Sequence, residues 1–361
     1  MSTFRSDVVG SLLRPDHLKE ARARRAAGEL SHAEFKRIED RAVDEAVALQ
    51  TAAGLEVITD GEMRRYAFFG HLIDSAEGFD KFGGWAIPFR DEAGNELVFK
   101  RPVVVSKLRR LRPMCGEEFT YLRARAERPV KTTLISAQQA AAYYDPNKSK
   151  AAYATIDAYL ADVVDLLRTE VDELVRLGCT YIQVDAPQYA ALLDPQIREG
   201  YRQRGNDPDR LLARCIELDN AVIGDHPGVT FGIHLCRGNN QSKYYASGGY
   251  DPIVEVFRQT KFQRFLLEYD DERSGGFEPL RSVPEDRTVV LGLVTTKKPA
   301  LETKDELKGR IAAAAQIIPL ERLALSPQCG FASTEEGNLI SPADQAAKLR
   351  LVAETAREVW G

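Results

Sequence analysis

The chain has 361 residues, of which 44% are hydrophobic and 29% charged, as is ordinary for a globular protein with a sizeable core. The 49 Lys and Arg against 54 Asp and Glu give a net charge of −5, spread along the chain, so neither a nucleic-acid footprint nor a polybasic membrane patch is expected. Its apolar runs are too short to span a bilayer, and its first residues lack the apolar core of a signal peptide, which predicts a cytoplasmic protein.

Short apolar runs rich in β-branched residues alternate along the chain with amphipathic segments of helical length. The runs predict eight strands, at 7–10, 56–59, 130–135, 181–184, 229–234, 264–268, 288–293 and 322–325. The amphipathic segments predict helices at 33–53, 151–177, 208–223, 251–259, 304–317 and 342–358. Because the strands are almost continuously apolar, they suit a parallel sheet that is covered on both faces.

This alternation predicts an α/β fold, a (β/α)8 TIM barrel built as a single domain over residues 1–361. The long segment of about 64–128 after the second strand is an insertion. The alternative is a doubly wound open sheet, which usually carries a Gly-rich phosphate turn after its first strand, and Val9-Gly10-Ser11-Leu12 is not such a turn.

Polar residues follow nearly every predicted strand, and barrel enzymes build their sites at this carboxyl-terminal rim. They are Gly10-Ser11, Asp60-Gly61-Glu62, Ser136, Asp185, His234-Leu235-Cys236, Glu268, Thr295-Thr296-Lys297 and Gln328-Cys329. Two cysteines, a histidine and several acids would therefore meet at one end of the barrel.

His234-x-Cys236 is the most specific motif of this set. Residues i and i+2 of an extended strand point the same way, so both side chains can face one metal ion. Glu268 and Cys329, from two other strand ends, would complete a tetrahedral site of imidazole, thiolates and carboxylate, a set that zinc favours. Such a zinc suits the activation of a thiol, since a coordinated thiol is deprotonated. A displaceable Glu268 would let the substrate sulfur enter.

The remaining cysteines and histidines have simpler interpretations. Cys115, Cys179 and Cys215 sit in apolar contexts and are predicted to be inert buried thiols. His71 lies close to Glu62 in the sequence, which leaves open that it reaches the site.

These motifs resemble the C-terminal catalytic half of cobalamin-independent methionine synthase, and even more its short single-barrel relatives, which include enzymes similar to epoxyalkane:coenzyme M transferase. The matching stretches run in the family's order from the first strand to the last. They are Val9-Gly10-Ser11, Asp60-Gly61-Glu62, Ile182-Gln183-Val184-Asp185, His234-x-Cys236, Glu268 and Ser326-Pro327-Gln328-Cys329-Gly330.

The resemblance implies a zinc ion (Zn2+) held by His234, Cys236, Glu268 and Cys329. It also implies that homocysteine is the thiol substrate. Glu62 and Asp185 would bind its amino group, and the backbone around Gly10 and Ser11 would bind its carboxylate. Charge-assisted bonds of this kind would orient the sulfur toward the metal.

The sequence also departs from the family pattern, always on the side of the alkyl donor. No tryptophan follows the third strand, where the family stacks one on the pterin. Val294-Thr295-Thr296-Lys297-Lys298-Pro299 replaces the family's Asp-Ile-His-Ser-Pro, whose histidine serves proton transfer. Ala186 stands where a second acid usually follows Asp185, and no second barrel for a polyglutamylated folate is present.

The leading hypothesis is therefore a zinc-dependent thiol S-alkyltransferase, and specifically methyl transfer to homocysteine to form methionine. The donor alternatives are methyl-folate, methylcobalamin on a corrinoid partner protein, and a small S- or N-methyl compound. A second hypothesis is epoxide opening by coenzyme M, with Tyr143, Lys297 or His71 as proton donor. Hypotheses of other classes are a metal-free porphyrinogen-decarboxylase-like lyase and a binding protein with a structural zinc.

Overall fold

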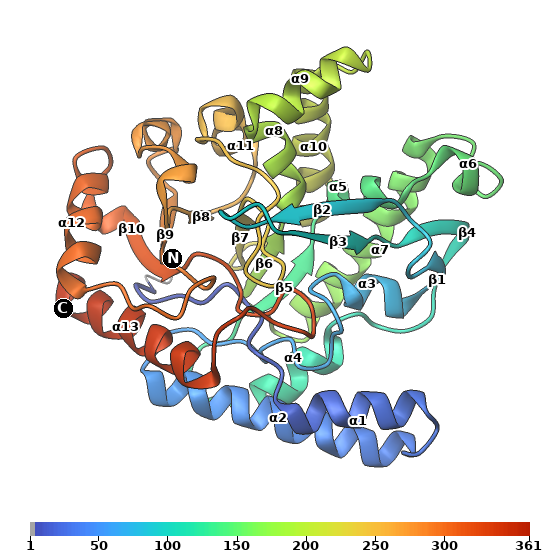
Figure 1. Ribbon diagram of the computed structural model, residues 1–361, viewed down its shortest axis with the longest axis horizontal. Helices are drawn as coiled ribbons and strands as arrows, with labels where there is room; N and C mark the ends of the chain where they lie inside the picture. Colours follow the sequence, from blue (N-terminus) through green and yellow to red (C-terminus); the bar gives the residue numbers. More distant parts are fainter. Residues whose placement is uncertain (1–3) are drawn as a thin grey trace.

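The computed structural model describes residues 4–361. At its centre lies a six-stranded parallel sheet in the order β10-β9-β8-β7-β6-β5, with helices around it (Figure 1). The strands are β5 (Thr132–Ile135), β6 (Tyr181–Asp185), β7 (Thr230–Leu235), β8 (Arg264–Glu268), β9 (Thr288–Val294) and β10 (Leu323–Pro327). Each strand pairs with its neighbour in sequence, whereas a doubly wound sheet reverses its order at a switch point.

The first two predicted strands are not regular strands, and each is represented by a single parallel bridge at one edge of the sheet. Ser6 pairs with Leu325 of β10, and Ile58 pairs with Val130 beside β5. The two segments also meet each other, because the Leu12 amide donates a 3.0 Å hydrogen bond to the Gly61 carbonyl. The prediction of regular strands at 7–10 and 56–59 was therefore wrong, since each segment leaves its partner after one pairing.

The predicted helices are confirmed to within a few residues at most ends. They are α2 (His32–Ala53), α7 (Ile156–Arg176), α10 (Pro208–Ile223), α11 (Val254–Gln259), α12 (Lys304–Ala315) and α13 (Pro342–Trp360), with α1 (Asp16–Ala26) packed against α2. Capping boxes begin α2, α12 and α13. Further short helices are α3 (Gly70–Ser75), α4 (Gly116–Arg123), α5 (Ala137–Ala140), α6 (Pro146–Ser149), α8 (Ala190–Leu193) and α9 (Pro195–Gln203).

The insertion 64–128 contributes no strand to the central sheet. It forms two antiparallel pairs, β1 (Ala76–Asp80) with β4 (Val103–Arg110), and β2 (Ala86–Arg90) with β3 (Glu96–Lys100). Pro88 is tolerated in β2 because that strand pairs with β3 on one side, and its other side makes only one bridge, from Arg90 to Tyr244.

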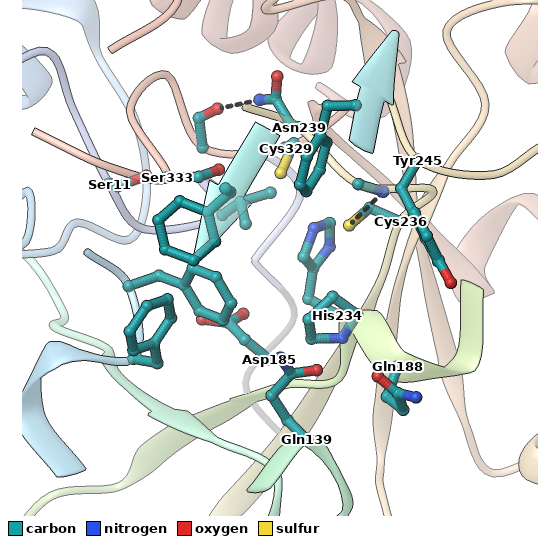
Figure 2. A pocket seen from close by; sticks show the side chains of 18 of the residues that line it. Ser11, Gln139, Asp185, Gln188, His234, Cys236, Asn239, Tyr245, Cys329 and Ser333 are labelled. Carbon is teal, nitrogen blue, oxygen red and sulfur yellow. Dashed lines mark hydrogen bonds between the residues drawn. The ribbon is translucent and has the colours of Figure 1, made fainter. Parts of the chain in front are cut away.

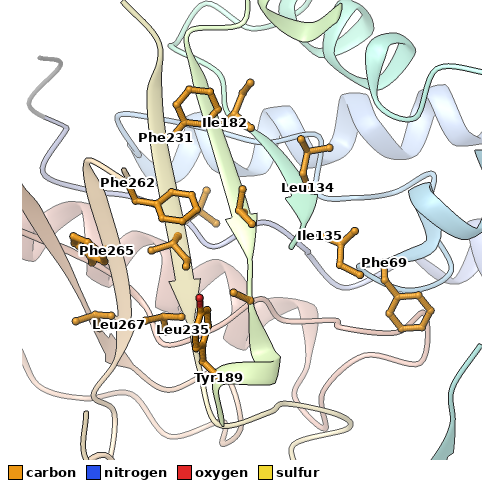
Figure 3. Close-up of a cluster of buried hydrophobic side chains, with 14 of the residues drawn as sticks. Phe69, Leu134, Ile135, Ile182, Tyr189, Phe231, Leu235, Phe262, Phe265 and Leu267 are labelled. Atoms are coloured by element: carbon orange, nitrogen blue, oxygen red, sulfur yellow. The ribbon is translucent and has the colours of Figure 1, made fainter. Parts of the chain in front are cut away.

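The core lies between the sheet and its helices. Figure 3 shows apolar side chains such as Leu134, Ile182, Phe231 and Phe265 along the neighbouring strands β5 to β8, and all four are buried. Within the part of the chain that the structure describes, no helix is long and apolar enough to cross a membrane.

Candidate active site

Three of the four predicted metal ligands lie together at the carboxyl-terminal end of the sheet. One ligand atom each from His234, Cys236 and Cys329 falls within 4.8 Å of the others, and all three residues are buried. Figure 2 shows their side chains pointing into a common space. Because β7 and β10 are parallel, their ends bring residues nearly a hundred positions apart to the same edge.

The orientation of His234 suits metal binding. Its Nδ1 lies 3.2 Å from the carbonyl oxygen of Leu266, so Nδ1 carries the proton and donates it. The buried Nε2 has no hydrogen-bond partner. A buried ring nitrogen with a free lone pair costs free energy unless a ligand uses it, so this atom is available for a metal ion.

The thiols of Cys236 and Cys329 shift each other's pKa in opposite directions. Cys236 accepts a hydrogen bond from Cys329, and this bond, with the neighbouring His234, holds the pKa of Cys236 well below its usual value despite burial. The same bond and burial raise the pKa of Cys329. The Gly238 amide also donates to the Cys236 sulfur, at 3.4 Å. One thiolate, a second thiol and a free imidazole nitrogen form a donor set that fits zinc.

Glu268, the fourth predicted ligand, ends β8 next to this cluster but is not among the three residues whose ligand atoms converge. Its Oε2 accepts a 2.6 Å hydrogen bond from the Arg237 amide, and its Oε1 lies 3.2 Å from the Lys297 ammonium and 3.3 Å from the Arg273 guanidinium. Burial alone would raise its pKa, but the charges of Lys297, Arg237 and Arg273 lower it to about 2. Glu268 is therefore an ionised carboxylate whose oxygens are already engaged.

Glu62, one of the two acids predicted to bind the amino group, has a free oxygen. The Thr133 hydroxyl donates a 2.8 Å hydrogen bond to its Oε1, and the Arg65 guanidinium lies 3.7 Å away, while the buried Oε2 has no partner. Glu62 lies in the left-handed backbone region at φ 56°, which is strained for a residue other than glycine. A Cβ at Gly10 would come within 2.8 Å of Glu62 Oε1, so glycine makes room for this carboxylate.

Asp185, the second acid, ends β6 and pairs in register with His234. The Gln183 amide donates a 2.7 Å hydrogen bond to its Oδ1. Burial raises the pKa of Asp185 to about 7, and the nearby charge of Glu62 acts in the same direction. A cation between the two carboxylates would relieve both costs, as expected of a site for an ammonium group.

Of the eight predicted site residues, all except Gly10 and Glu268 line one cavity of about 860 Å3, counting the space open to solvent. Ser11, Glu62 and Asp185 line it together with His234, Cys236 and Cys329. The metal-binding cluster and the two acids therefore face one shared cavity.

The three proton donors considered for epoxide opening have different environments. Tyr143 lines the cavity, and its buried hydroxyl has no partner. Lys297 instead faces Glu268 and Asp270. His71 accepts a hydrogen bond from the Ile135 amide at Nε2 and contacts the Phe68 carbonyl through Nδ1, so it is a neutral ring held by backbone. Of the three, Tyr143 is placed to act on a substrate.

Sequence reasoning missed the wall that the insertion adds to this cavity. The hairpin β2–β3 and the residue after it supply Ile87, Phe89, Phe99 and Arg101, and other aromatic residues join them. These are Phe68, Phe69, Tyr143 and Tyr245. The only sequence signal for this wall was the density of aromatic and basic residues in 64–128. That signal does not reveal that the hairpin folds back over the ends of the strands.

Comparison with known proteins places the chain in a family. The sequence profile of the cobalamin-independent synthase catalytic domain matches residues 4–349. The chain belongs to this family. Family membership makes it a methyltransferase of methionine biosynthesis, and confirms the resemblance that the strand-end motifs indicated.

Relatives of the cobalamin-independent synthase family cover the whole chain. The uncharacterized protein YxjH of Bacillus subtilis is 37% identical over 99% of this chain and 95% of its own length. The methionine synthase of Pyrococcus abyssi is 25% identical over 90% of this chain and 86% of its own length. A crystal structure of the putative vitamin-B12 independent methionine synthase of Listeria monocytogenes superposes with a TM-score of 0.75 at 26% identity, covering 100% of this chain and 99% of that one.

Proposed function

We propose that this member of the synthase family transfers a methyl group to homocysteine in a zinc-dependent reaction that forms methionine. The observation that carries the proposal is the joint placement, in one cavity, of the His234–Cys236–Cys329 cluster and the unpartnered Glu62 carboxylate oxygen. The methionine synthase of Pyrococcus abyssi, by its name, performs this kind of reaction.

In this proposal His234, Cys236 and Cys329 hold the metal, with Glu268 as the fourth and most easily displaced ligand. When bound, zinc would keep a coordinated thiol in its thiolate form at neutral pH. Glu268 suits exchange because its carboxylate is retained by Lys297, Arg273 and the Arg237 amide whether or not it touches the metal.

The amino-acid end of homocysteine would lie between Glu62 and Asp185, with its carboxylate toward the backbone of Gly10 and Ser11. These contacts would fix the direction of the sulfur toward the strand ends of β7 and β10. The new carbon–sulfur bond forms as the bond between methyl and donor breaks, and its electron pair stays on the donor. The aromatic wall excludes water from the reacting carbon.

Other functions receive less support. Epoxide opening with coenzyme M is favoured by the free Tyr143 hydroxyl in the cavity, but that thiol has no ammonium group for Glu62 and Asp185. A metal-free porphyrinogen-decarboxylase-like lyase would leave the His-Cys-Cys cluster without a role. A structural zinc site would not open on a cavity. The comparisons give no support to a corrinoid partner protein.

We propose further that the fold is a single-domain (β/α)8 barrel in which 5–11 and 56–61 take the first two strand positions. The bridges of Ser6 to Leu325 and Ile58 to Val130, and the hydrogen bond between Leu12 and Gly61, connect the two edges of the sheet through these segments. The TM-score of 0.75 with the Listeria structure supports a shared fold.

The proposed function is tested by measuring methionine formation from homocysteine. Zinc-loaded protein, metal-stripped protein and Cys329→Ala are each supplied with 5-methyltetrahydrofolate, methylcobalamin or S-methylmethionine. We expect activity with at least one donor, its loss on stripping, and recovery on zinc addition in the wild type alone. Full activity of the metal-stripped protein would refute the proposal.

A further inference from the structure

Arg101 is a cation in the wall of the active-site cavity that the chain itself does not neutralise. Its side chain forms no hydrogen bond or ion pair with any residue of 4–361, and its Nε is buried without a partner. Burial lowers its pKa, and the groups whose charge acts on it are the hydroxyls of Tyr245, Tyr143 and Tyr201 rather than carboxylates. Two other arginines of the insertion do have acidic partners, since Arg109 pairs with Glu77 and Arg110 pairs with Glu170.

The backbone of Arg101 is fixed, so this placement is built into the insertion. The Arg101 amide donates to the Trp85 carbonyl at 3.1 Å, and the Gly84 amide donates to the Arg101 carbonyl at 2.9 Å. A Cβ at Gly84 would come within 2.6 Å of the Arg101 carbonyl oxygen and closer still to that of Pro102. The glycine pair of 83–84 thus allows the close approach that positions Arg101.

The hairpin that precedes Arg101 is also docked onto the rim of the sheet. Arg90 and Tyr244 exchange two backbone hydrogen bonds of 2.9 Å, and the Lys243 ammonium lies 2.6 Å from the Asp91 carboxylate. Since 237–245 follows Cys236 directly, these bonds hold the hairpin over the metal-binding cluster. Arg101 and the cluster therefore line the same cavity.

Aromatic rings surround the space between Arg101 and the cluster. The centroid of the Phe69 ring lies 5.9 Å from that of Phe99 and 5.8 Å from that of Tyr143. The ring centroids of Phe89 and Tyr245 are 6.2 Å apart. Figure 2 shows Tyr245 on the opposite side of the cavity from Ser11. Tyr245, one of the tyrosines whose hydroxyl acts on the charge of Arg101, thus lies across the cavity from Ser11, a residue proposed to bind the amino acid.

We propose that this part of the cavity binds the methyl donor, and that the donor carries its methyl group on an aromatic or apolar body that also bears an oxyanion for Arg101. This inference rests on the proposed function. A guanidinium binds a carboxylate or phosphate through paired charge-assisted hydrogen bonds, and aromatic rings stack on a flat body. The methyl group passes to the homocysteine sulfur, the electron pair of the broken bond stays on the donor, and the thiol proton neutralises the departing donor atom.

The test is calorimetric titration of zinc-loaded protein, with homocysteine present, by 4-methoxybenzoate and by the uncharged 4-methoxybenzamide. These probes have nearly the same shape and differ in charge. We expect the wild type to bind the benzoate at least tenfold more tightly, Arg101→Gln to lose this preference, and Arg101→Lys to retain part of it. Arg112→Gln, at an exposed arginine of the same insertion, should leave the preference unchanged.

A parallel titration with 5-methyltetrahydrofolate distinguishes two donor sources. If Arg101→Gln weakens its binding tenfold or more, the oxyanion belongs to a folate, and if only the benzoate responds, it belongs to a smaller aromatic acid. Equal or undetectable binding of both benzoyl probes by the wild type, with no effect of Arg101→Gln on the folate, overturns the inference.

A separate titration with homocysteine alone distinguishes the two proposals. Unchanged homocysteine affinity in Arg101→Gln is expected. A tenfold weakening would assign Arg101 to the carboxylate of the thiol and overturn the inference while leaving the proposed function intact. Failure of the wild type to bind homocysteine would instead count against the proposed function.

Discussion

The ammonium of Lys297 lies 3.2 Å from Oε1 of Glu268 and 3.0 Å from Oδ2 of Asp270, and all three side chains are buried. One lysine thus neutralises two carboxylates beside the metal-binding cluster, at a position where the family pattern has a histidine. Removing one partner of a buried ion pair leaves an uncompensated charge and costs far more than removing an exposed pair.

Lys297→Met should therefore destabilise the metal-free protein by about 3–5 kcal/mol. Zinc should restore more stability to this variant than to the wild type, because the metal replaces the lost positive charge beside Glu268. Thermal unfolding with and without zinc measures both effects. Lys298→Met, whose exposed partner is Glu92, is the matched control and should change little. Equal effects of zinc on both variants would contradict the argument.

Thr133→Val should weaken homocysteine binding by about five- to tenfold, because it removes the 2.8 Å hydrogen bond that orients Glu62. Zinc content should not change, since Thr133 contacts none of the metal-binding residues. Thr132→Val is the neighbouring control, because the Thr132 side chain contacts Cys179 instead. Calorimetric titration with homocysteine measures the effect, and identical affinities of the two variants would show that Thr133 does not position the carboxylate.

Cys329→Ala should lose zinc, whereas Cys179→Ala should keep it. The Cys179 thiol lies in the core, 3.3 Å from the Tyr181 carbonyl, and contacts none of the metal-binding residues. Its loss should therefore affect packing alone. Metal analysis after dialysis against a weak chelator reads the difference directly. Retention of zinc by Cys329→Ala would remove this cysteine from the ligand set.

The buried carboxyl group of Asp219, outside the active site, should make the stability of the protein depend on pH. It is buried with the Tyr189 hydroxyl as partner, 2.9 Å away, and burial raises its pKa from 3.8 to about 8. Between these two pKa values Asp219 keeps its proton in the folded chain and loses it in the unfolded chain. The resulting stability is fully present below pH 3.8 and is lost as the pH rises through about 8.

Asp219→Asn should remove this dependence. Its unfolding temperature should exceed that of the wild type at pH 9 by more than at pH 5, as measured by thermal unfolding at both values. Asp225→Asn, at an exposed position, serves as control. A difference that does not grow with pH would show that Asp219 is already ionised in the folded protein at neutral pH.

Much of this site could be predicted because strand ends are readable in sequence. Apolar runs located β5 to β10, and parallel strands must place the residues that follow them, such as Asp185, His234 and Cys329, at one edge. The position of Glu268 could be predicted in the same way. Its engagement by Lys297 and Arg273 could not, because it depends on how two separate loops pack.

The donor side was less predictable for a physical reason. Arg101 and the β2–β3 hairpin reach the cavity through tertiary contacts such as that of Asp91 with Lys243, which are 152 residues apart in sequence. No local pattern encodes such a contact. The irregular pairing of 7–10 and 56–59 was missed similarly, because a short apolar run predicts a strand whether it makes one bridge or several.

The most direct test of the account is the zinc–sulfur coordination measured by X-ray absorption, before and after homocysteine is added to the zinc-loaded protein. The account predicts about one zinc per chain, bound by sulfur from Cys236 and Cys329, nitrogen from His234 and one oxygen ligand. Homocysteine should add one sulfur and remove the oxygen. A sulfur count that homocysteine leaves unchanged would contradict the claim that this cluster activates the substrate thiol.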